Sequence, residues 1–152
     1  MCLGARSKLS KWEKTYEELL VERKNRDRRM LEQLLPVLIE FHRVMDAWVS
    51  VEFKGLKDEI THVKGLCRRK SAKKRILDFK KEVNQFKPGQ AGTPLQRFDE
   101  LIDSVKRGRF ESPEEAITMV EERFTPVLSL IFSLRKTRER LDLVSDMVCT
   151  EH

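Results

Sequence analysis

Glycine and proline are scarce in this sequence, which has 6 glycines and 5 prolines in 152 residues. All-β folds need many tight turns, and disordered chains are often rich in these residues, so the scarcity disfavours both classes. Charged residues make up 37% of the chain and hydrophobic residues 39%, and charges of both signs alternate along most segments. This composition is typical of amphipathic helices and predicts an all-α protein.

Cysteine is also rare. Cys2, Cys67 and Cys149 are widely spaced and form no C-x-x-C pair, which predicts free thiols in a reducing compartment. No apolar run approaches the roughly 18 residues of a membrane span, and the first residues lack the apolar core of a signal peptide. We therefore expect a cytoplasmic protein, with a lipid on Cys2 as the weaker alternative.

The sequence carries little that predicts chemistry. Its histidines, His42, His62 and His152, show no metal-ligand spacing, either with one another or with a cysteine. Gly89 and Gly92 are not followed by the Lys-Ser/Thr of a phosphate-binding loop. We expect no metal, no cofactor and no catalytic residue, so a non-enzymatic role is predicted.

The first half of the chain predicts helices with an apolar stripe at steps of three and four. Ser10 and Glu13 form a capping box, so a helix is expected to begin there after a disordered stretch at residues 1–9. Pro36 predicts a kink, with a true break as the alternative. Gly55 permits a turn, after which a second helix is expected.

That second helix is expected at residues 56–67, and Ser71 is expected to cap a third. Residues 23–29 interrupt the apolar stripe with charges, which predicts either a solvated stretch or a contact with a partner. Aromatic residues on the stripe are expected to be core or interface anchors, and exposure of a tryptophan would favour a partner surface. They are Trp12, Tyr16, Phe41 and Trp48.

The second half contains clear boundaries. Residues 87–93 carry glycine and proline and predict a loop. Thr93 and the proline after it predict a helix at residues 94–106, which Gly108 ends. Ser112 opens a last long helix, in which Pro126 again predicts a kink.

Together these elements predict one domain at residues 10–148, with a C-terminal tail at 149–152. The expected architecture is a kinked antiparallel helical bundle, for which four-helix-like packing is one form.

The positive charge is concentrated in one segment. Residues 54–87 contain 12 basic and 4 acidic residues, whereas the rest of the chain contains 19 basic and 21 acidic residues. The basic run, defined as the six basic residues between positions 68 and 75, is its densest part. It comprises Arg68, Arg69, Lys70, Lys73, Lys74 and Arg75.

This basic run has four interpretations: a solvated junction, a docking site for an acidic protein surface, a nuclear or nucleic-acid contact, and a contact with an anionic membrane. Among the binding interpretations the acidic protein surface is preferred, and a nucleic-acid or nuclear adaptor is the alternative. No aromatic residue is interleaved with the run to stack on bases. Ser71 follows three basic residues and is a candidate phosphorylation site.

Three stretches resemble the sperm acrosome-associated protein nine family. This family is a group of small, spectrin-like helical proteins that bind inside ciliary microtubules. Residues 71–77 are similar to that family's Ser-x-x-Arg-Arg-aliphatic helix start, and residues 91–94 to its Ser-Gly-Thr-Pro. Residues 112–116, followed by 127–131, resemble an acidic-Glu-Ala start that leads into a Val-Val-Ser-Leu-Ile helix. The order and spacing agree over about half the chain, whereas the N-terminal half is much more charged than in the family.

The resemblance implies a spectrin-like bundle as the other form of the fold. It also implies tubulin as the acidic partner and the axoneme of a cilium or flagellum as the location. The nucleus is the alternative location, which the basic run rather than the resemblance indicates. It implies no catalytic residue, because the family is not one of enzymes.

Overall fold

The protein is folded into helices. A computed structural model describes the backbone of residues 2–150 and the side chains of residues 11 and 13–148, and this part contains four helices and no strand. The all-α prediction is therefore confirmed. The helices are α1 (Cys2–Leu66), α2 (Lys70–Asn84), α3 (Pro94–Lys106) and α4 (Pro113–Thr150).

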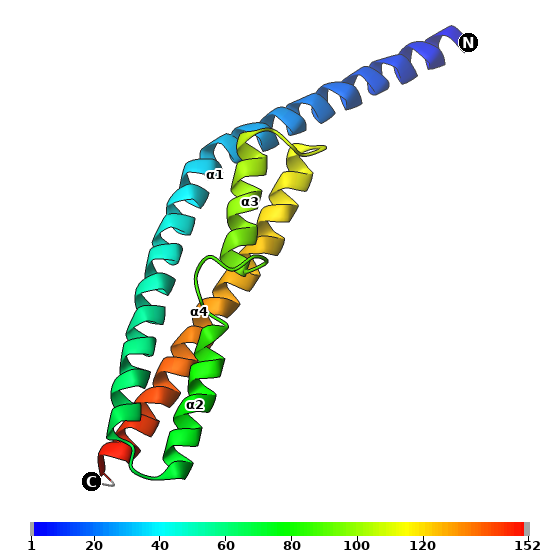
Figure 1. Ribbon diagram of the computed structural model, residues 1–152. Helices are drawn as coiled ribbons and strands as arrows, with labels where there is room; N and C mark the ends of the chain where they lie inside the picture. Colours follow the sequence, from blue (N-terminus) through cyan, green and yellow to red (C-terminus); the bar gives the residue numbers. More distant parts are fainter. Residues whose placement is uncertain (1, 151–152) are drawn as a thin grey trace.

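The helices form a long bundle in which α2 and α3 lie one after the other beside α1 and α4 (Figure 1). α1 and α4 run side by side in the same direction. α2 and α3 follow one another in the opposite direction, and both pack against α1 and α4. Four helices thus occupy three positions, and the chain does not adopt the four-helix-like packing. The N-terminal part of α1 extends beyond the bundle (Figure 1).

The core is one cluster of buried apolar side chains that comes from all four helices. In α4 the buried apolar residues recur every seven positions along most of the helix. A seven-residue repeat keeps one face of a helix turned toward its neighbours and favours a left-handed supercoil. These residues of α4 are Val120, Val127, Leu134, Leu141 and Val148.

α1 continues without interruption through Gly55, so the predicted turn there and the separate helix at residues 56–67 are wrong. Phe53, Leu56 and Ile60 are buried on both sides of the glycine at steps of three and four. A continuous helix keeps all three side chains in one core. Their burial outweighs the roughly 1 kcal/mol by which glycine disfavours a helix relative to alanine.

The substitution Gly55→Ala is expected to raise the free energy of unfolding by up to about 1 kcal/mol, because alanine is the better helix former. A Cβ at this position would lie 3.9 Å from Nη1 of Arg138, which is an ordinary contact. Urea denaturation of the two proteins measures the difference. Gly108→Ala is the control and should destabilise, because Gly108 has a φ of +66°. A loss of stability in Gly55→Ala would contradict the continuous helix.

Pro36 and Pro126 both lie inside continuous helices, so the alternative that Pro36 breaks its helix is wrong. Both prolines are exposed, whereas Leu38 and Val127 nearby are buried. A proline on the solvent side leaves the buried face of a helix intact, although it removes one backbone hydrogen bond. α1 is visibly bent where its N-terminal part leaves the bundle (Figure 1).

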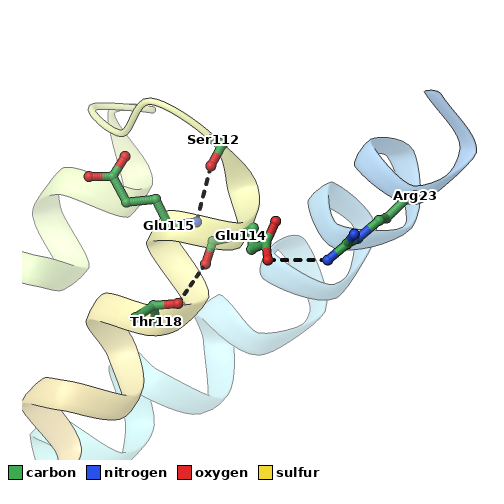
Figure 2. Close-up of polar contacts among 5 residues, drawn as sticks. All are labelled: Arg23, Ser112, Glu114, Glu115 and Thr118. Atoms are coloured by element: carbon green, nitrogen blue, oxygen red, sulfur yellow. Dashed lines mark hydrogen bonds and ion pairs between the residues drawn. The ribbon is translucent and has the colours of Figure 1, made fainter. Parts of the chain in front are cut away.

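α3 and α4 begin at the predicted residues. Thr93 Oγ1 accepts a hydrogen bond from the backbone N–H of Gln96 at 3.3 Å. Ser112 Oγ accepts one from the backbone N–H of Glu115 at 3.1 Å (Figure 2). The side chains of Gln96 and Glu115 each accept a hydrogen bond from the preceding loop. Both starts therefore have the reciprocal bonding that the sequence pattern indicates.

The predicted starts at Ser10 and Ser71 are wrong. α1 begins at Cys2, because residues 2–9 contain no proline and each residue added to an existing helix gains a hydrogen bond. α2 begins at Lys70, so Ser71 lies inside its first turn. The connection between α1 and α2 is residues 67–69, so the chain is helical again before it reaches Ser71.

The predicted C-terminal tail is also shorter than expected, because α4 continues to Thr150. The remaining part of the predicted tail, residues 151–152, lies outside the described residues.

Candidate docking site at the basic end of the bundle

The basic run lies at the end of the bundle where α1 ends and α2 begins. Arg68 and Arg69 are in the connection, and the other four residues are in the first two turns of α2. All six side chains are exposed. Within the part of the chain that the structure describes, none of them forms an ion pair, whereas other basic side chains of the bundle do. Their charge is therefore available to a partner.

A groove of about 220 Å³ separates the start of α2 from the end of α4, which lie side by side in Figure 1. Arg69 and Arg75 contribute basic side chains to it. Its apolar lining comes mainly from α4. The lining residues are Arg69, Ser71, Ala72, Arg75, Val144, Met147 and Val148.

The fold does not bring the whole basic run into this groove. Arg69 and Arg75 line it, whereas Arg68 does not. Lys70 and Lys74 are four residues apart, so they share another face of α2, and Lys73 lies beside them. The run therefore divides into a groove pair, Arg69 and Arg75, and a group that faces away from the groove.

The first turn of α2 is poorly optimised for helix stability. Its N-cap, Arg69, makes no side-chain capping bond, and the turn contains no acidic residue. Positive charge at a helix N-terminus is unfavourable, because it opposes the helix dipole. Residues that do not favour the stability of their own helix are expected at functional positions. The start of α2 is therefore a candidate for a binding surface.

Ser71 is exposed and lines the groove beside Arg69 and Arg75. A phosphate on Ser71 would lie in the first turn of α2, where the helix dipole favours negative charge. It would also neutralise part of the positive charge of the groove. Phosphorylation at Ser71 stays a prediction.

The ion pairs that connect α4 to other helices are absent from the sequence-based predictions, and two of them lie in the second half of α4. Arg138 Nη1 lies 3.0 Å from Glu59 Oε2 of α1, and Arg138 Nε lies 3.6 Å from Asp142 Oδ1. Arg140 Nη1 lies 2.5 Å from Glu82 Oε1 of α2. Only the spacing of four between Arg138 and Asp142 could have been found in the sequence.

Burial raises the pKa of the Glu59 carboxyl above its ordinary value of 4.5, and the charge of Arg138 only partly opposes this effect. The folded protein therefore binds the Glu59 proton more tightly than the unfolded chain does. The contribution of Glu59 to stability is fully present below the unfolded pKa and is lost as the pH rises through the folded pKa.

We expect that the stability of the wild-type protein relative to Glu59→Gln increases as the pH falls from about 7 to about 4. Urea denaturation of both proteins across this range measures it, and the difference cancels the titration of groups that do not interact with Glu59. An unchanged difference, or a decrease at low pH, would contradict the raised pKa.

A second hollow of about 270 Å³ lies at the α2–α3 loop and includes His42, Asp46 and Asp99. His42 Nε2 is 3.0 Å from the backbone carbonyl oxygen of Leu95, and Nδ1 is 3.9 Å from Asp99 Oδ1. His42 thus connects α1 to α3. Among the described residues, no group of three or more His, Cys, Asp or Glu could hold a metal ion.

None of the helices, as far as the structure describes them, is both long and apolar enough to cross a membrane. No family model matches the chain, and no curated protein and no solved structure matches it either. The family resemblance at residues 71–77, 91–94 and 112–131 therefore stays a prediction.

Proposed function

We propose that this protein is a structural interaction protein that docks onto an acidic protein surface through the basic end of its bundle. The observation that carries the proposal is the groove between α2 and α4, where Arg69 and Arg75 lie beside apolar residues. Basic side chains attract an acidic partner over a distance, and an apolar groove supplies a place for an anchoring side chain.

The combination of charge with an apolar groove favours a protein partner over nucleic acid. A site for single-stranded nucleic acid would be expected to expose aromatic side chains that stack on bases, but Phe79, the aromatic residue nearest the run, is buried. Tubulin in the lumen of a ciliary microtubule is the partner that the family resemblance implies.

The test is co-sedimentation with microtubules at low and moderate salt, with the protein added either before or after tubulin polymerises. We expect pelleting that weakens with salt and is strongest when the protein is present during assembly, because luminal sites are then accessible. Absence of pelleting in both formats would contradict tubulin as the partner. Binding to duplex DNA or RNA at low salt would instead favour the nucleic-acid alternative.

Three double variants, each with the same change in net charge, locate the binding surface. Arg69→Glu with Arg75→Glu alters the groove, and Lys73→Glu with Lys74→Glu alters the other face of α2. Lys54→Glu with Arg109→Glu is the control, because both residues are exposed and lie outside the basic run. We expect the groove variant to lose the most affinity. Equal loss in all three would show that only net charge matters and would contradict the groove as the site.

A further inference from the structure

The N-terminal part of α1 has apolar side chains that the bundle does not cover. Tyr16 is 64% exposed, Leu19 58% and Met30 49%, and Leu20 is also exposed. The buried core of the described residues begins only at Leu31. We call residues 11–30 the extension. It projects past the ends of α3 and α4 (Figure 1).

One ion pair connects the middle of the extension to the bundle. Arg23 Nη2 lies 3.1 Å from Glu114 Oε1 in the first turn of α4 (Figure 2). Residues 11–22 lie beyond this contact. Isolated helices of this length are marginal in water, and the stability of most helices comes from packing of an apolar face. A helix with exposed Tyr16, Leu19 and Leu20 is therefore suited to pairing with another helix.

The distribution of charge along the extension indicates which helix would pair with it. Residues 11–22 contain 4 acidic and 2 basic residues, whereas residues 23–29 contain 5 basic and 1 acidic residue. Two copies side by side in the same direction would place like charges together. Two antiparallel copies would place the acidic half of each beside the basic half of the other, which is favourable on both sides of the dyad.

The charges that flank the apolar stripe agree with this orientation. Glu17 and Arg28 are eleven residues apart, so they occupy the same flank of the helix, and Glu22 and Arg26, four residues apart, occupy the other. In an antiparallel pair each flank meets the same flank of the other copy. Glu17 of one copy then lies near Arg28 of the other, and Glu22 near Arg26.

We infer that the extension is a self-association site, at which a second copy of this chain pairs with it as an antiparallel helix. The two bundles then lie at opposite ends of the helix pair, so both basic ends point outward. The dimer does not depend on the proposed docking function, because it uses the other end of the molecule.

Sedimentation equilibrium of the full chain, up to about 500 µM, tests the inference at low salt and at about 1 M salt. We expect a dimer at low salt that is weaker at high salt. Leu19→Glu and the double variant Glu17→Lys with Glu22→Lys should each weaken dimerisation by at least about tenfold. Circular dichroism checks that the bundle stays folded, which is expected because these side chains lie outside its core.

A charge-swapped variant distinguishes a specific pair from a general effect of charge. Glu17→Lys and Glu22→Lys combined with Arg26→Glu and Arg28→Glu restores opposite charges across the antiparallel pair and keeps the wild-type net charge. We expect this variant to dimerise again. A wild-type protein that is monomeric at every concentration, or a dimer that Leu19→Glu and the Glu17/Glu22 variant leave unchanged, would overturn the inference.

Disulfide trapping determines the orientation. In a background with Cys2, Cys67 and Cys149 replaced by serine, Tyr16→Cys and Met30→Cys proteins are mixed and oxidised. An antiparallel pair should give mainly the mixed dimer, because Tyr16 of one copy lies near Met30 of the other. A cross-link formed mainly between two Tyr16→Cys chains would overturn the antiparallel arrangement.

Discussion

Phe98→Ala is expected to lower the free energy of unfolding by about 3–5 kcal/mol. Phe98 is completely buried, and its ring centroid lies 5.5 Å from that of Phe41 in an edge-on arrangement. The ring also stacks beside His42 at 6.3 Å. Its removal leaves a cavity between α1 and α3, which a close-packed interior closes only in part. Urea denaturation followed by circular dichroism measures the loss.

Phe132→Ala is the matched control. Phe132 lies on α4 and is 63% exposed, and Lys136 Nζ lies 5.5 Å from the centre of its ring. Its truncation removes at most one exposed cation–π contact and should cost no more than about 1 kcal/mol. A similar loss in both variants would contradict the placement of Phe98 in the core.

Val63→Asp is expected to destabilise the protein as much as Phe98→Ala or more. It should either lower the free energy of unfolding by more than about 4 kcal/mol or abolish the cooperative unfolding transition. Val63 is fully buried in the part of α1 that follows Gly55. An aspartate there must either lose its hydration or force the helix away from the core. Thermal unfolding followed at a helical wavelength measures the effect.

Val51→Asp makes the same chemical change on the same helix, but Val51 is 70% exposed. It should alter stability by no more than about 0.5 kcal/mol. If Val63→Asp were tolerated equally well, the end of α1 would not belong to the core, and residues 56–67 would be a separate, loosely packed helix.

The positions where helices begin could be predicted from the sequence when the cause is local. Thr93 and Ser112 cap α3 and α4 because each hydroxyl reaches a backbone N–H three residues later in its own chain. Ser71 also has a hydroxyl but is not a cap, since α2 already begins at Lys70. The seven-residue spacing in α4 is also present in the sequence. Apolar residues recur there at steps of three and four as well, so the sequence alone does not show which of them are buried.

Similar reasoning applies to the candidate sites. The sequence located the concentration of positive charge at residues 68–75 and the interruption of the apolar stripe at 23–29, because both depend only on the order of residues. It did not show that Arg69 and Arg75 share a groove with the end of α4, because that requires residues far apart in the chain to meet. It also did not show that Tyr16 is left uncovered.

The sequence by itself determined the helical class, the starts of α3 and α4, and the uneven distribution of charge, because these follow from composition and from contacts within a few residues. Only the tertiary structure decided that α1 continues through Gly55, that α2 and α3 share one position in the bundle, and that the extension lies outside it. Each of these outcomes depends on which segments meet distant segments in the core and which do not, and burial in the core outweighs local preferences of about 1 kcal/mol.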